Sequence, residues 1–203
     1  MEQIDSRIIE LMASRLCHEF VGPAGAVANG LELVEDTGGD LAEEAMEMVG
    51  ASAKELTARI KFYRIAYGVG GISSNNLAEL RGLSFAFVGE GHSRFSWPMP
   101  PIAPRLEDGE GKLVLNMIAL AKSALPRGGD VNVDIDGKEL VVRAIGEGAG
   151  LPDDLVCTMT TKVEFEVLTP RNIHGFWAAL LARRVQRKLD YKLINAEEVI
   201  IKA

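Results

Sequence analysis

The first 67 residues carry a helical pattern that is broken at one place, and this feature most limits what the chain can fold into. Residues 4–36 read as one helix, which Gly38 and Gly39 stop. Asp40 begins a second helix that runs to about residue 67. Because a lone pair of long helices leaves most of its apolar surface in water, we expect a second copy to complete a dimeric four-helix bundle.

Each of the two helices has an apolar stripe with helical spacing. On the first helix the stripe contains Leu16, Phe20, Val27, Leu31 and Val34. On the second it contains Leu41, Ala45, Met48, Ser52, Leu56, Ile60 and Tyr63, with Ser52 as the weak member.

The pattern changes after a glycine-rich linker at residues 68–76, and helices then mix with short strands. Helices are predicted over 76–89, 109–125 and 169–189. Strands are predicted over 92–97, in a hairpin over 130–146 with Asp136-Gly137 at its turn, and over 191–203. The sequence therefore predicts an α+β fold with two domains, a hairpin over 1–70 and an α/β domain over 71–203.

One face of the first helix carries a histidine with little bulk around it. On a helical wheel His18 lies about 160° from Phe20, opposite the apolar stripe. The same face has Ser14, Gly22, Gly25 and Asn29, with Arg15 at its edge. Pro23 lies between the two glycines and is expected to bend the helix there. This face suits the close approach of another macromolecule, and the alternative is a solvated surface histidine.

Bulk properties narrow the classes of function. The formal net charge of −7 argues against nucleic acid or an anionic membrane as the main partner. The start, MEQIDSRIIE, lacks the features of a signal peptide, so we expect a cytoplasmic protein. Two cysteines, Cys17 and Cys157, and three histidines, His18, His92 and His174, have no metal-ligand spacing, so no metal site is expected. His92 and His174 are expected to be structural or surface residues.

Residues 18–23, HEFVGP, have the form H-E-x-x-x-P. This resembles the H box of two-component histidine kinases, in which the histidine on the first helix of a dimeric hairpin is phosphorylated. A neutral imidazole is a competent nucleophile near pH 7. Glu19 is a candidate to orient the ring, or else an ordinary solvated acid. If the hairpin pairs about residue 38, three basic residues lie near His18 as candidate partner contacts or plain surface charges: Lys54, Arg59 and Lys61.

The second domain resembles the ATP-binding (Bergerat-like) domain of histidine kinases in outline, and it departs from that domain at three nucleotide positions. Residues 115–129 look like the N box, but Leu120 stands where the magnesium-binding asparagine belongs. Residues 144–152 look like the DxGxGIP box, but Gly146 replaces its aspartate. Phe176 falls in the last glycine box, where a phosphate loop needs small residues. The resemblance implies a degenerate domain without a nucleotide cofactor.

The combination is similar to the alphaproteobacterial histidine phosphotransferase family, most specifically over residues 15–34. The resemblance covers nearly the whole chain, and Glu19 stands where the family commonly has aspartate. It implies a homodimer that relays a phosphoryl group through His18, between the receiver domain of a hybrid kinase and the cell-cycle response regulators CtrA and CpdR. The partner receiver would bring its own aspartate and Mg²⁺, and no nucleic acid or membrane is implied.

Three alternatives remain open at this stage. A true histidine kinase would bind nucleotide, and the residues at the three degenerate positions speak against that. A dimeric scaffold without chemistry would make His18 incidental. A relic of an anti-sigma-type kinase would not need the long hairpin. We rank the relay first and the scaffold second.

Overall fold

The computed structural model describes residues 6–37, 40–68, 76–89, 93–98, 105–135, 139–160 and 162–203. Its helices are α1 (Ser6–Thr37), α2 (Asp40–Tyr67), α3 (Leu77–Val88), α4 (Glu110–Ser123), α5 (Asp153–Val156) and α6 (Ile173–Arg184). Its strands are β1 (Ser93–Ser96), β2 (Gly129–Ile135), β3 (Leu140–Ile145), β4 (Asp190–Asn195) and β5 (Glu198–Lys202). The α+β class is confirmed. The predicted turn at Asp136-Gly137, the linker over 69–75 and His92 lie outside the described residues.

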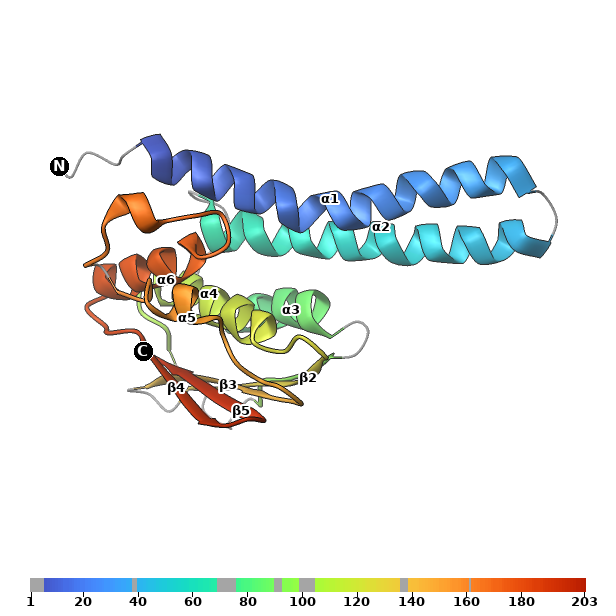
Figure 1. The fold of residues 1–203 in the computed structure, drawn as a ribbon. Helices are drawn as coiled ribbons and strands as arrows, with labels where there is room; N and C mark the ends of the chain where they lie inside the picture. Colours follow the sequence, from blue (N-terminus) through green and yellow to red (C-terminus); the bar gives the residue numbers. More distant parts are fainter. Residues whose placement is uncertain are drawn as a thin grey trace.

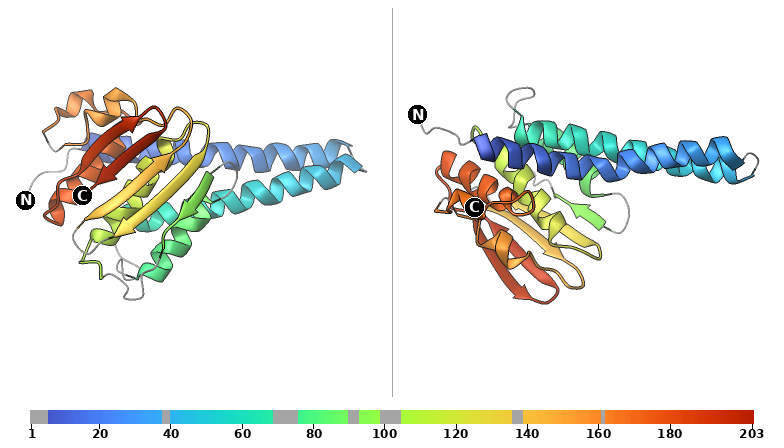
Figure 2. Two further views of the ribbon diagram at one scale, coloured as in Figure 1. Left: turned by 90° about the horizontal axis from the view of Figure 1, so that it is seen from below. Right: turned by 45° about the horizontal axis from the view of Figure 1, so that its top comes forward.

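The elements form three layers (Figure 1). The hairpin of α1 and α2 lies on top, α3, α4 and α6 lie below it, and the sheet lies below these helices. The far half of the hairpin projects beyond the rest of the chain. Figure 2 shows the other face of the sheet in the foreground, with the helices behind it.

The five strands form a mixed sheet in the order β1-β2-β3-β5-β4. β2 and β3 pair antiparallel, as do β3 with β5 and β4 with β5. Only β1 pairs parallel to its neighbour β2, from Ser93 opposite Gly129 to Ser96 opposite Asn132. The predicted strand pair at the C-terminal end is therefore confirmed, and β1 is an edge strand.

The base of the hairpin is built into the core of the second domain. Phe62 and Tyr63 of α2 are almost fully buried in the same cluster as the helices below them. The ring of Phe62 stacks on Phe87 of α3, with centroids 3.9 Å apart. One continuous core therefore crosses the predicted domain boundary, and it holds the two parts together by burial of apolar surface.

Part of each predicted apolar stripe is exposed in a single copy of the hairpin. On α2, Met48 and Ile60 are 63% and 46% exposed. Val49, which lies outside the predicted stripe, is buried where Gly30 brings the two helices together, and a Cβ at position 30 would lie 2.6 Å from the Val49 side chain. Leu31, also predicted in the stripe, is 44% exposed.

The last helix is shorter than the predicted 169–189. It ends at Arg184, and Gln186 adopts a left-handed conformation with φ of 57°. The N–H of Arg187 then donates to the carbonyl of Ala182, which closes the helix end. Among the helices of the described residues, none combines the length and the apolar character that crossing a membrane requires.

Candidate functional site

Helix α1 runs without a break through Pro23, which is a buried residue. Figure 1 shows the helix bent near its middle. Proline has no N–H, so the carbonyl of Glu19, four residues earlier, loses its normal helical donor. Arg59 of α2 takes that place, since its Nη1 donates to the Glu19 carbonyl oxygen at 2.8 Å. The proline therefore creates an acceptor that ties the two helices together beside the histidine.

His18 lies on α1, five residues before this proline. Its side chain is exposed, and the structure gives it no hydrogen-bond partner among the described residues. A Cβ added at Gly22 or at Gly25 would meet no other atom within 4 Å, so the surface next to the imidazole is bare. Asn29, further along this side, is exposed as well. This geometry agrees with the helical wheel and leaves the imidazole side chain accessible to a partner.

Glu19, the next residue, points the other way, toward the second domain. Its two carboxylate oxygens each lie 3.4 Å from an arginine, Arg15 on α1 and Arg59 on α2. Arg59 also pairs with Glu55 one turn earlier. In this structure the Glu19 carboxylate is engaged with these two guanidinium groups. Its predicted role in orienting His18 stays a prediction.

Two of the predicted partner contacts, Arg15 and Arg59, do not lie on the His18 face. Arg15 is only 8% exposed, because it lies between the hairpin and the second domain rather than at the edge of the His18 face. Arg59 faces the same inner side, where it lines a small cleft with Tyr63, Phe87 and Lys122. Lys54 and Lys61 are exposed on α2, and their predicted contact with a partner remains a prediction.

Arg15 reaches a fully buried histidine from the other end of the chain. Its Nη2 lies 3.2 Å from Nδ1 of His174 on α6. Arginine has only donors, so Nδ1 accepts and Nε2 carries the proton, which it donates to Oδ1 of Asn116 at 3.1 Å. Burial, together with the charge of Arg15, holds the pKa of His174 well below its ordinary value of 6.5, so the ring is neutral. The expectation that His174 is structural is confirmed.

The same asparagine completes the end of the second hairpin helix. Nδ2 of Asn116 donates to the carbonyl of Ala66 at 3.0 Å, in the last turn of α2, where carbonyls lack helical donors. It also donates to the carbonyl of Lys112 at 2.8 Å. We call Arg15, His174 and Asn116 the buried polar triad. The triad joins α1, α2, α4 and α6. No sequence pattern indicated that Arg15 pairs with His174, which is 159 residues away.

The three positions that departed from the kinase boxes are all packed by the fold. Leu120 is fully buried in the core under α4. A Cβ at Gly146 would lie 2.4 Å from the carbonyl oxygen of Gly128, so a side chain there needs backbone movement. Phe176 is 5% exposed and packs in a cluster with Ile8 at the start of α1. The hairpin therefore covers the segment that resembles the last glycine box.

Two surviving glycines of the boxes have backbone roles. Gly148 adopts φ of 72° in a turn, a backbone conformation that disfavours residues with a side chain. Gly175 lies against Thr158 and Leu155, whose atoms would be 2.4 and 2.7 Å from an added Cβ. Within the described ranges, no group of three or more His, Cys, Asp or Glu side chains could hold a metal ion.

Comparison with known proteins gives a consistent result. The model of the histidine phosphotransferase C-terminal domain matches residues 77–197, more than half of the chain. The chain belongs to this histidine phosphotransferase family. It is 28% identical over 199 residues to the protein phosphotransferase ChpT of Brucella abortus (strain 2308), covering 95% of this chain and 93% of that protein. A solved structure described as a bacterial phosphotransferase covers 100% of this chain, with a TM-score of 0.82 and 25% identity.

The family model and the similarity to ChpT confirm the prediction, made from the sequence resemblance, that the protein is a phosphotransferase. The matched domain begins at α3, so the family model does not include the helix that carries His18. The similarity to ChpT and to the bacterial phosphotransferase structure extends over nearly the whole chain, hairpin included. The geometry of α1 is therefore the evidence from this chain that bears on which residue reacts.

Proposed function

We propose that this histidine phosphotransferase relays a phosphoryl group through His18, between a receiver domain of a hybrid kinase and response regulators, without binding ATP. The observation that carries the proposal is the exposed imidazole on a bare helical face, backed by a neighbouring residue whose side chain is held by two arginines. His18 is free to meet a partner, while the backbone beneath it is held in place.

In the proposed step, one nitrogen of the neutral imidazole attacks the phosphorus of an aspartyl phosphate on the receiver. A P–N bond forms, the P–O bond to the aspartate breaks, and the aspartate leaves as a carboxylate. Transfer to the next receiver is the reverse. Such a transfer depends mainly on positioning and on neutralising phosphoryl charge. We assign that charge neutralisation to the Mg²⁺ of the receiver, with Lys54 and Lys61 as candidate contacts on α2.

The second domain supports a relay rather than a kinase. Leu120 and Phe176 fill core positions with apolar side chains, and Gly146 has no room for the aspartate that would bind adenine. The start of α1 packs on Phe176, so nucleotide entry there would require the hairpin to move. The expectation of no nucleotide cofactor rests on these contacts.

We further propose that the protein is a cytoplasmic homodimer whose hairpins form a four-helix bundle. The support is apolar surface that one copy leaves in water along the hairpin: Val21, Leu31, Leu33, Met46, Met48 and Ile60 are all between 44% and 65% exposed. Burial of such surface is the usual driving force for bundle formation. The resemblance points to cell-cycle response regulators of the CtrA and CpdR type as recipients.

The deciding experiment mixes a receiver domain carrying radiolabelled phosphate with wild type and with His18→Ala, beside a lane that contains labelled ATP alone. We expect label on wild type only, with the ATP lane blank and unfolding midpoints unchanged. Label arriving from ATP would make the protein a kinase. Absence of label from wild type with several receivers would favour the scaffold, in which the dimer binds regulators without chemistry.

A further inference from the structure

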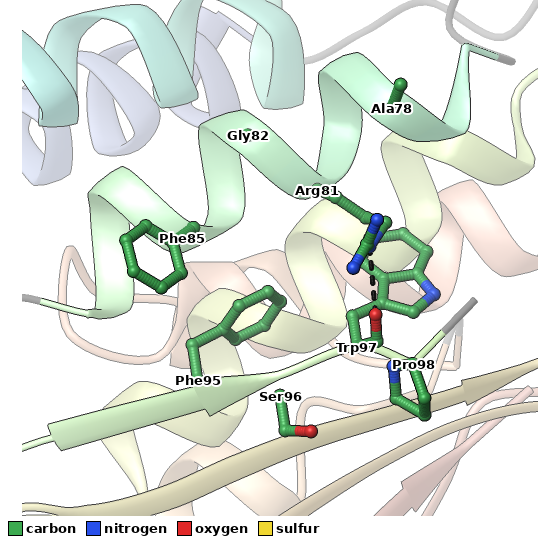
Figure 3. A pocket seen from close by; sticks show the side chains of 8 residues that line it. All are labelled: Ala78, Arg81, Gly82, Phe85, Phe95, Ser96, Trp97 and Pro98. Carbon is green, nitrogen blue, oxygen red and sulfur yellow. Dashed lines mark hydrogen bonds between the residues drawn. The ribbon is translucent and has the colours of Figure 1, made fainter.

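A second surface of the molecule has the features of a binding groove and lies outside the His18 face. It is an open groove of about 540 Å³ between α3 and the edge strand β1 (Figure 3). Its lining residues are Ala78, Arg81, Gly82 and Phe85 on the helix side, and Phe95, Ser96, Trp97 and Pro98 on the strand side.

Aromatic side chains line both walls of the groove, and on the helix side a glycine leaves open space between them. Phe85 and Phe95 face each other across the gap, and Phe85 is 62% exposed. Between Phe85 and Ala78, a Cβ added at Gly82 would meet no other atom within 4 Å. An apolar side chain of a partner that packs against these two rings would be buried favourably.

The strand side offers backbone hydrogen bonds. Among the strands of the described residues, β1 is the first in the sheet order, and its one neighbour there is β2. An edge strand has outward N–H and C=O groups that can pair with an added extended chain. A groove between a helix and an edge strand is the arrangement in which extended peptides bind by strand addition.

The groove also carries a positive charge. Nε of Arg81 donates to the carbonyl oxygen of Trp97 at 2.8 Å, which fixes the plane of the guanidinium (Figure 3). No carboxylate within the described ranges pairs with Arg81, although the chain has a formal net charge of −7. The remaining guanidinium N–H groups match the two oxygens of a carboxylate.

The spacing of these groups matches an extended peptide. Arg81 and Phe85 are one helical turn apart, which is about 6 Å along α3. Alternate residues of a strand, whose side chains point to the same side, are about 6.6 Å apart. A carboxylate and an apolar side chain at positions i and i+2 of one strand can therefore contact Arg81 and the Phe85–Phe95 pair together.

We propose that this groove binds an extended, acidic segment of a partner protein, which adds to β1 as a further strand. Its apolar side chain lies between Phe85 and Phe95 over Gly82, and its carboxylate binds Arg81. This binding is separate from phosphotransfer at His18, so it stands or falls independently of the proposed relay.

The test uses the full chain and a phage-displayed library of random dodecapeptides, selected on wild type and on Gly82→Leu. Leucine at this open helical position fills the groove and favours the helix by about 1 kcal/mol. Gly82→Ala is the matched control, because it gives the same helical gain with little bulk. We expect wild type and Gly82→Ala to enrich peptides in which Asp or Glu stands two residues from a large apolar residue. Equal enrichment on Gly82→Leu, or no enrichment on wild type, would overturn the proposal.

Charge dependence is then measured by fluorescence anisotropy with the best peptide and its amide version, Gln for Glu or Asn for Asp. Arg81→Gln, which keeps a donor for the Trp97 carbonyl, should weaken the acidic peptide about tenfold and leave the amide peptide unchanged. Equal weakening of both would contradict a carboxylate contact.

Phosphotransfer to His18 should be the same in wild type and Gly82→Leu, and a parallel loss would make the groove part of receiver docking. Self-association by light scattering that Gly82→Leu abolishes would assign the groove to a second copy instead.

Discussion

The two faces of α1 near the middle of the helix differ in exposure and in the contacts that they make. On the outer face, His18 is exposed and the glycines beside it leave open space. On the inner face, Glu19 is held by two arginines and its carbonyl is bound by one of them. Neighbouring residues of one helix therefore have opposite environments, since the His18 face is open to solvent while the Glu19 face is tied to α2.

The difference also shows what the second domain now contributes. Asn116 and His174 come from segments that resemble nucleotide boxes, yet both are hydrogen-bonded within the buried polar triad that holds α1 on α6. In this chain those segments pack against the hairpin. The inner face of α1 is held by these segments, and within the described residues the outer face at His18 makes no contact with them. Substitutions on the inner side should therefore change stability, and substitutions on the outer side should change phosphotransfer.

The largest effect is expected from breaking the triad. His174→Leu removes the acceptor of Arg15 and the donor to Asn116, and it leaves a buried guanidinium short of one partner. We expect the free energy of unfolding to fall by about 2–3 kcal/mol, measured by urea denaturation. His174→Gln, which offers an oxygen and an N–H on a similar side chain, should recover at least half of this loss. Equal loss in both variants would mean that shape matters there and hydrogen bonding does not.

The next largest effect is expected from adding bulk to the face of α1 that carries His18. Gly25→Leu places bulk two turns from His18, where an added Cβ meets nothing within 4 Å. Gly25 is a cleaner choice than Gly22, which precedes a proline and gains strain from any Cβ. We expect phosphotransfer from a receiver to slow about tenfold, or about 1.4 kcal/mol, with stability unchanged or up to about 1 kcal/mol higher.

Its matched control is Ala13→Leu, because Ala13 is exposed about 140° around the helix from His18. That variant should transfer phosphate at the rate of wild type. If both variants slowed transfer alike, the bare surface around His18 would have no special part in docking.

Much of this comparison could be predicted from the sequence. Helical periodicity placed His18 opposite Phe20, and both long helices and most strands lie where turn residues and alternation put them. Arg15 was assigned to the wrong side because a wheel describes one helix and does not show where a second domain packs. The pairing of Arg15 with His174 depends on contacts between the two ends of the chain, which periodicity does not encode. The burial of Val49, which the predicted stripe omits, depends on Gly30, where the two helices approach each other closely.

A pH dependence should follow from the buried ring of His174. Its pKa is lowered in the folded protein by burial and by Arg15, so the unfolded chain binds more protons below about pH 6.5. Stability is therefore present above that pH and is lost as the pH falls toward the lowered pKa. We expect a loss of about 1.2 kcal/mol between pH 7 and pH 5.5 from this group, measured by urea denaturation at each pH. In His174→Gln this part of the pH dependence should vanish. An unchanged slope in that variant would assign the proton uptake elsewhere.

The smallest effect is expected in the coupling energy between Pro23 and Arg59. Pro23 has no N–H to donate to the Glu19 carbonyl, and Arg59 donates to that carbonyl instead. Arg59→Ala leaves the Glu19 carbonyl without the bond at 2.8 Å, so it should cost about 1–2 kcal/mol of stability. In a Pro23→Ala background the helix can supply its own donor, from residue 23 to residue 19. The same arginine substitution should then cost about 1 kcal/mol less. Denaturation of the two single variants and the double variant measures this coupling. Additive losses would mean that Arg59 acts through its carboxylate partners alone, whereas a positive coupling would show that the H-box proline and the inner face of the hairpin form one structural unit beneath His18.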